Sequence, residues 1–309
     1  MNPSVNKKKT DLHNSEMTHR VGVLMADSAN SFWADMKNHY ERIAPELGLT
    51  VEIVWPLIDQ DPESQIEALF DMLDKSFDAI VINPLNKRNL VPGIFACIKK
   101  EIPVLDAGAK TDQFLVKDAM PHYIPVSTVD FYEQGVMGAE YILKRLGLSD
   151  GGKVAIIEGR KESAQSIGRS QGAADVFLES PSIQVFTRKP AGFDRKKALD
   201  VALDILKQEP EIRAFFCAND LMALGVADAA DTLEKRGHFI IVGVDLIDEA
   251  RKAIRDGRMD ASIAFSRASV VRMVLKEVTL ALGGESYQDI SRVESHLVSK
   301  ENVDIHHDR

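Results

Sequence analysis

The feature that most constrains the fold is a short apolar run that ends at two polar residues and passes directly into a helical pattern. The apolar residues 214–218 are followed by Asn219 and Asp220, and the helical pattern begins with residues 221–225. A buried parallel strand delivers polar groups to the rim of a sheet in this way, and ligands of open α/β folds bind at that rim. Asn219 or Asp220 could instead only cap the helix, a position that favours both residue types. The rest of the chain favours a ligand contact for Asn219 and a helix cap for Asp220.

Apolar strands alternate with helical patterns along most of the chain. We predict strands at residues 21–26, 50–55, 78–82, 102–106, 153–157, 182–186, 214–218, 238–242, 260–264 and 293–298. Helical patterns separate them, and a βαβ order implies parallel sheets with right-handed crossovers and helices on both faces.

The two halves of the chain resemble each other. The strand at 78–83 and the strand at 213–219 both end in Asn, and the strand that follows each of them ends in Asp106 and Asp245. A chain of 309 residues also exceeds the usual size of one hydrophobic core. We therefore expect an α/β fold of two similar lobes, each a parallel sheet flanked by helices, with a cleft between the carboxyl ends of their strands.

Composition and missing motifs exclude several functions. The net charge of −9 makes nucleic acid an unlikely partner, because an acidic surface repels phosphates. Two cysteines in apolar contexts do not make a disulfide framework or a four-cysteine zinc site, and no His-Glu-x-x-His pair occurs. The chain has no phosphate-binding loop, dinucleotide turn or nucleophile elbow. We expect no enzyme activity, no cofactor and no metal.

The predicted strand ends carry polar and aromatic residues suited to a neutral polyhydroxylated ligand. Amides and carboxylates engage adjacent hydroxyls with two atoms, and arginine adds a rigid fork of donors. Phe32 and Phe193 could instead be ordinary core residues, and Arg169 could lie on a solvated helix face. The candidates are Asn30, Phe32, Trp33, Asn83 and Asp106 in the first lobe and Arg169, Phe193, Asn219 and Asp245 in the second.

Several motifs resemble those of a known family. The most specific are Ala218-Asn-Asp-Leu-Met-Ala-Leu-Gly225 and Val242-Gly-Val-Asp245, in that order. With Asn30-Ser-Phe-Trp33, Arg169-Ser-Gln-Gly172 and shorter matches they extend from Val21 to about Val303. The chain resembles the ribose- and galactose-type branch of the type I periplasmic solute-binding proteins, whose fold is shared by the ligand core of LacI-type repressors.

The resemblance implies a ligand site and a lobe organisation. Asn30, Phe32, Trp33 and Asn83 would hold the ligand from the first lobe, and Arg169, Phe193, Asn219 and Asp245 from the second. It implies three hinge strands, near 126–129, 264–267 and 291–294. The expected divisions are a disordered tail at 1–19, an N-lobe of 20–127 plus 266–292, and a C-lobe of 128–265 plus 293–309.

Two departures from the family pattern bear on the ligand. The ribose-like pattern has an Asp-Arg pair where this chain has Gly108-Ala109, and the family often has a polar residue where this chain has Phe265. Phe265 would then form an apolar wall of the site. Asp106 or Lys110 could compensate, but their register does not fit direct replacement. A polyol, a deoxy or modified sugar, or another small polar metabolite remains open.

The resemblance implies a monomeric solute-binding protein that closes on its ligand and serves an ABC-type uptake transporter. A ligand-sensing receptor that feeds a signalling partner is the alternative. A LacI-like repressor would need an N-terminal helix-turn-helix, for which residues 1–19 are too short and too polar. We expect a periplasmic or other extracytoplasmic location. Residues 1–19 lack the apolar core of a secretory signal, so the signal was removed or was never present, or the chain is cytoplasmic.

Overall fold

A computed structural model describes residues 18–147, 151–285 and 292–305. Most of the predicted tail at 1–19 lies outside these ranges, although His19 already belongs to the first strand. Part of the predicted hinge at 291–294 and the chain end at 306–309 also lie outside them. Within the described ranges, no helix is both long and apolar enough to cross a membrane.

The first lobe is built on a parallel sheet in the order β2-β1-β3-β4-β5. Its strands are β1 (His19–Leu24), β2 (Leu49–Val54), β3 (Ala79–Ile82), β4 (Val104–Ala107) and β5 (Tyr123–Val126). Every residue of the central strand β3 is buried, as its unbroken apolar sequence predicts.

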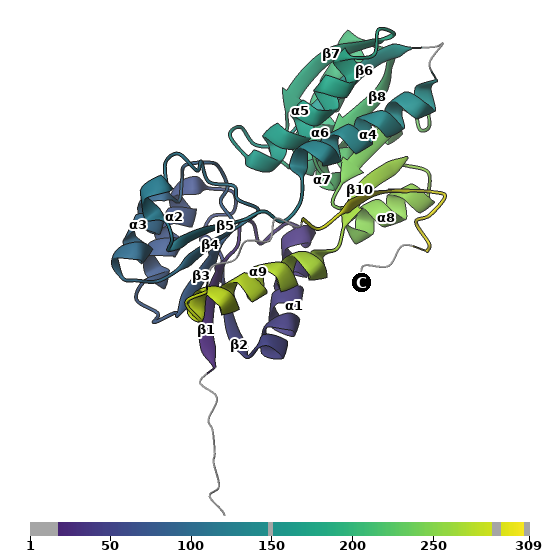
Figure 1. Cartoon of the computed structure of the whole chain (residues 1–309). Coiled ribbons are helices and arrows are strands. Elements are labelled where there is room, and N and C mark those ends of the chain that lie inside the picture. Colours follow the sequence, from purple (N-terminus) through teal and green to yellow (C-terminus); the bar gives the residue numbers. More distant parts are fainter. Residues whose placement is uncertain (1–17, 148–150, 286–291, 306–309) are drawn as a thin grey trace, which may run out of the picture.

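Helices cover both faces of this sheet, as Figure 1 shows. One apolar core joins the sheet to α1 (Ser31–Ile43) and α9 (Arg267–Leu282), and a second joins it to α2 (Pro62–Met72) and α3 (Val91–Lys99). Two short 3₁₀ turns, η1 (Ala44–Leu47) and η2 (Lys117–Ala119), complete the lobe.

The second lobe has a sheet in the order β11-β10-β9-β8-β6-β7. Its strands are β6 (Gly152–Glu158), β7 (Ile183–Pro190), β8 (Ile212–Cys217), β9 (Ile240–Val244), β10 (Ala261–Phe265) and β11 (Ser295–Ser299). Its helices are α4 (Phe131–Leu146), α5 (Ala164–Leu178), α6 (Arg195–Gln208), α7 (Asp220–Thr232) and α8 (Asp248–Arg255). The helices α4 and α5 pack on one face, and α6, α7 and α8 pack on the other.

The two sheets repeat one topology. The order β2-β1-β3-β4-β5 in the first lobe corresponds to β7-β6-β8-β9-β10 in the second. This confirms the predicted fold of two similar α/β lobes, which are separate bodies joined by connecting segments in Figure 1. Cys97 and Cys217 are free and buried, one in each lobe.

Two strands differ from the prediction. The strand β5 is not among the predicted strands, and it forms the edge of the first sheet, where its proline is tolerated because one side of the strand needs no partner. The last strand, β11, is antiparallel to β10, because the chain returns from α9 in the first lobe to the edge of the second sheet.

Candidate functional site

All nine residues predicted to bind the ligand line one pocket between the lobes. The first lobe and the start of α1 contribute one wall, and the strand ends of the second lobe contribute the other. The nine are Asn30, Phe32, Trp33, Asn83, Arg169, Phe193, Asn219, Asp245 and Phe265.

The aromatic wall of the first lobe is positioned by a helix cap. The side chain of Asn30 caps α1 by accepting a hydrogen bond from the backbone N–H of Phe32 at 3.0 Å, which places Phe32 and Trp33 in the first turn. The two rings pack edge to face with centroids 5.1 Å apart, and Phe32 also lies 6.1 Å from Phe265 of β10. Phe32 packs against the cores of both lobes, so its role as a core residue and its place in the pocket coexist.

Asn83 follows β3 and is held rigidly. Its Nδ2 donates to the carbonyl of Leu24 at 3.1 Å, and its Oδ1 accepts from Nζ of Lys110 at 3.3 Å. The side chain is buried, and its orientation is therefore set by the protein before any ligand arrives.

A buried ion pair lines the pocket on the side of the second lobe. Arg169 of α5 donates through Nη2 to Oδ1 of Asp245 at 2.8 Å, through Nη1 to the carbonyl of Ala218, and through Nε to Gln134. Arg169 is only 4% exposed, so it is not a solvated face residue. Burial raises the pKa of the Asp245 carboxyl, and the guanidinium beside it opposes that effect.

Close packing of α4 against α5 brings Arg169 to this position. A side chain on Gly135 of α4 would lie 2.0 Å from the carbonyl oxygen of Arg169, and one on Gly172 of α5 would lie 2.1 Å from that of Tyr132. Only glycine permits the two backbones to approach so closely.

Asn219 lines the pocket as expected, but it also takes the capping role that was predicted for Asp220. Asn219, not Asp220, caps α7: its Oδ1 accepts from the N–H of Met222 at 3.0 Å while the residue also lines the pocket. Asp220 is the first residue of α7, and its carboxylate accepts from the N–H of Ile247 at 2.9 Å and from the hydroxyl of Ser262 at 2.7 Å. The prediction of Asp220 as the helix cap was wrong, because the helix begins one residue earlier than expected and the carboxylate of Asp220 bonds to Ser262 of β10.

Two pocket residues have unusual backbone conformations. Phe193 and Asp245 have φ values of 65° and 108°, a region that residues with a Cβ rarely adopt. Two hydrogen bonds hold the backbone of Asp245 in place. Its N–H donates to the carbonyl of Ile263 at 2.8 Å, and Arg267 donates to the carbonyl of Asp245 at 2.8 Å. Such strain persists where surrounding contacts enforce it, commonly at ligand sites.

Residues 21–286 match the family described as "Periplasmic binding protein domain". This chain belongs to that family. The D-allose-binding periplasmic protein of Escherichia coli (strain K12) is 37% identical over 254 residues, which cover 82% of this chain and 81% of that protein.

Solved structures agree in fold. A periplasmic solute-binding protein of an ABC transporter from Actinobacillus succinogenes, with bound D-allose, superposes with a TM-score of 0.84 at 23% identity, over 93% of this chain and all of that one. The fructose-binding periplasmic domain of a hybrid two-component system superposes with a TM-score of 0.82 at 23% identity, over 93% of this chain and 92% of that domain.

The pocket of this periplasmic binding protein also contains residues that the sequence analysis did not place there. Several are small or apolar wall residues from the connecting segments and from α9, for which the sequence offers no signal. The additional residues are Met36, Ala107, Lys110, Thr128, Val129, Phe131, Arg160, Gln165 and Val270.

Lys110 lines the pocket against expectation, whereas Asp106 is not among the lining residues. Lys110 was judged out of register, but Gly108 and Ala109, with φ values of 95° and 49°, turn the chain after β4 so that Lys110 enters the pocket. Asp106 was placed at a strand end, yet it lies within β4 and is absent from the pocket lining that the structure describes. Its carboxylate accepts from the N–H of Thr111 at 2.7 Å and so holds the loop that carries Lys110.

The pocket as a whole suits recognition by hydrogen bonds. Amide, carboxylate, ammonium and guanidinium groups converge from both lobes, and aromatic rings close the sides. Because each lobe supplies half of the lining, a ligand that contacts both walls favours the arrangement in which the lobes are close together.

Proposed function

We propose that this protein binds a small polyhydroxylated solute, a sugar or polyol, between two closing lobes and delivers it to an ABC-type uptake transporter. The observation that carries this proposal is the convergence of strand-end side chains from both lobes on one pocket. Relatives named for binding D-allose and ribose support the ligand class.

The polar lining fits a binding role better than a catalytic one. Asp245, the one carboxylate in the described lining, already accepts a charged hydrogen bond from Arg169 at 2.8 Å through its Oδ1. We propose that the protein is not an enzyme, acts as a monomer at an extracytoplasmic site, and meets a membrane permease in its closed form. Relatives named as periplasmic support that location.

A ligand-sensing receptor is the second candidate. The similarity in fold to the periplasmic domain of a hybrid two-component system favours it, because the same closing cleft can signal to a kinase. Neighbouring genes separate the two functions: a permease and an ATPase indicate transport, and a histidine kinase indicates sensing.

Tryptophan fluorescence tests the site directly. The chain has two tryptophans; Trp33 lines the pocket and Trp55 lies beyond the end of β2, outside the described lining. A panel of neutral sugars, polyols and sugar acids is first screened by thermal shift, where a ligand at 100 times its Kd stabilises the folded state by about 2.7 kcal/mol. A hit should change the fluorescence of the wild type and of Trp55→Phe, but not of Trp33→Phe. A response that disappears only in Trp55→Phe places the site elsewhere.

A further inference from the structure

The charges in the pocket do not balance within its lining. Three cationic side chains, Lys110, Arg160 and Arg169, line the pocket with one carboxylate, Asp245. Arg169 uses Nε, Nη1 and Nη2 for hydrogen bonds to protein groups, and the ion pair with Asp245 neutralises it. Two cationic groups therefore remain without a paired anion in the described lining.

Lys110 directs its ammonium group into the pocket. Nζ lies 3.3 Å from Oδ1 of Asn83 and 5.2 Å from the centre of the Trp33 ring, and within the described residues it has no ion pair. An ammonium group has three protons to donate, so this one retains donors for a ligand. Burial lowers the pKa of Lys110 to about 8, and the positive charges of Arg169 and Arg160 act in the same direction.

The carboxylate that acts on the charge of Lys110, that of Asp106, is occupied elsewhere. Asp106 accepts hydrogen bonds from the backbone N–H of Lys110 at 3.0 Å, from that of Thr111 at 2.7 Å, and from the hydroxyl of Tyr123 at 2.8 Å. Asp106 raises the pKa of Lys110 and so offsets part of the burial effect, but its oxygens serve the loop and β5, not the ammonium group.

Arg160 presents unused donors. Its Nε and Nη1 are buried and have no hydrogen-bond partner among the described residues, while the guanidinium lies 5.1 Å from the centre of the Phe193 ring. Asp27, the carboxylate that acts on its charge, accepts instead from the N–H of Ala29 and from Gln60. A buried donor left unpaired is destabilising, and a planar anion satisfies two at once.

Resting on the proposed function, we infer that the ligand is an anionic sugar derivative whose charged group lies at Lys110 and Arg160. The hydroxyls of a neutral sugar would satisfy donors, but the two charges would then be offset only by Asp106 and Asp27, whose oxygens bind other groups. A carboxylate and a phosphate share this chemistry.

Calorimetric titration of the full chain with matched probes tests the inference. The pairs are D-ribose with D-ribonate, D-allose with D-allonate and D-galactose with D-galacturonate, and D-ribose 5-phosphate supplies the phosphate arm. We expect at least one acid to bind ten times or more tightly than its neutral partner. If the phosphate binds most tightly, it replaces the carboxylate as the anionic group and the inference holds.

Variants that remove one positive charge test whether Lys110 and Arg160 cause the preference for anionic ligands. Arg160→Met and Lys110→Met should each reduce the preference for the anion at least tenfold while leaving the melting temperature of the unliganded protein close to that of the wild type. Lys161→Met is the matched control, because Lys161 adjoins Arg160 but is exposed and outside the described lining. An equal loss in Lys161→Met would contradict a specific site.

The outcomes separate the two proposals. Neutral sugars that bind as tightly as their acids would overturn the anionic ligand and leave the proposed function standing. If no neutral or anionic probe binds, both proposals fail.

Discussion

Asn219 shows how one side chain can serve the fold and the ligand site together. Its Oδ1 is committed to the N-terminus of α7, whereas its amide nitrogen has no hydrogen bond among the described residues and the side chain lines the pocket. The two readings of the sequence, a cap or a ligand contact, are therefore compatible. The cap fixes the orientation of the side chain at the pocket.

Substitution of Asn219 should separate these two contributions. Asn219→Ala removes both, and should lower the free energy of unfolding by about 1 kcal/mol as well as weaken ligand binding. Asn219→Ser keeps a cap acceptor but lacks the amide donor, so binding should weaken while stability is retained. Urea unfolding and calorimetric titration measure the two effects. Wild-type affinity in Asn219→Ser would exclude the amide from the site.

Asp220 is a buried carboxyl that joins α7 to the loop after β9. Burial raises its pKa from 3.8 to about 8, and the nearby Asp245 acts in the same direction. Between these pH values the folded state retains a proton that the unfolded state releases, so this group makes the protein less stable as the pH rises.

The variant Asp220→Asn should remove that pH dependence. Its amide oxygen can still accept from the N–H of Ile247, but it does not ionise. The free energy of unfolding of the wild type should therefore fall, relative to that of the variant, as the pH rises from 3.8 to about 8. Urea unfolding across this range measures the difference. A constant difference would show that Asp220 does not titrate there.

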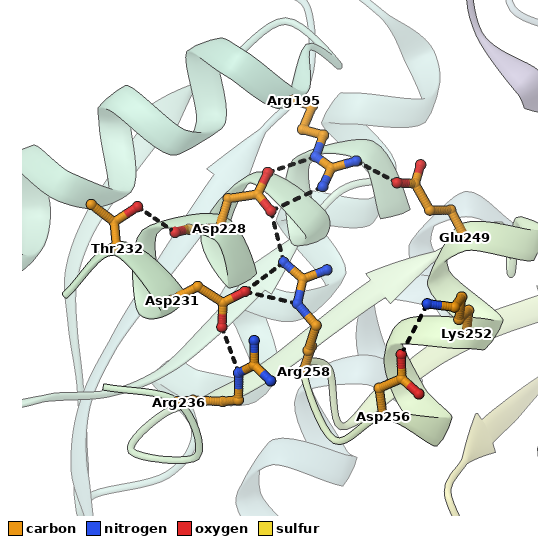
Figure 2. A network of polar contacts seen from close by, with 9 residues as sticks. All are labelled: Arg195, Asp228, Asp231, Thr232, Arg236, Glu249, Lys252, Asp256 and Arg258. Atoms are coloured by element: carbon orange, nitrogen blue, oxygen red, sulfur yellow. Dashed lines mark hydrogen bonds and ion pairs between the residues drawn. The ribbon is translucent and has the colours of Figure 1, made fainter. Parts of the chain in front are cut away.

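At the scale of elements, an ion-pair network joins the helices on one face of the second lobe. Figure 2 shows Asp228 of α7 between Arg195 of α6 and Arg258, with Arg195 continuing to Glu249 of α8 and Arg258 to Asp231. Burial favours a higher pKa for Asp228, but the hydrogen bonds from the two arginines lower it. Asp228 accepts hydrogen bonds from both arginines and so connects the two halves of the network.

The network should stabilise the lobe more than isolated surface pairs do. Asp228→Asn leaves two partly buried guanidinium groups with weaker partners, and we expect the free energy of unfolding to fall by about 1–2 kcal/mol. Lys252→Ala is the control, because its pair with Asp256 is an exposed contact at the C-terminal end of α8 and should matter by less than about 0.5 kcal/mol. Thermal unfolding compares them, and equal effects would show that the network adds nothing.

At the scale of the whole molecule, a few contacts cross between the lobes. Arg267 follows β10, pairs with Asp35 of α1 and donates to the carbonyl of Asp245 at 2.8 Å. At the rim, the N–H of Lys87 in the first lobe donates to the carbonyl of Glu162 in the second at 3.3 Å. We propose that the segments near 126–129 and 264–267 act as hinges, with a further hinge near 291–294.

Ligand binding should compact the molecule. A solute that contacts both walls stabilises the closed arrangement by its contacts to that state alone, so the radius of gyration should decrease at saturation. Small-angle scattering with and without a ligand found in the fluorescence screen measures this change. Trp33→Ala should require more ligand for the same change, and identical curves at saturation would exclude closure.

The sequence alone predicted the two-lobe architecture and nine of the residues that line the pocket. Apolar runs, helix periodicity and polar strand ends are local patterns, and parallel strands bring their carboxyl ends to one edge whatever the loops do. A resemblance in specific motifs added Phe265 to the residues at those ends.

Only the tertiary structure decided where the charged groups point. Lys110 enters the pocket because two residues with positive φ turn its loop, and Asp106 leaves it because Tyr123 and two backbone N–H groups bind its carboxylate. Arg160 follows β6, and only the folded chain places its guanidinium over the Phe193 ring with two donors that have no partner among the described residues. The direction of a side chain in a loop depends on partners far away in the sequence. Local sequence patterns thus determined where the pocket lies, and tertiary packing determined which charged side chains line it.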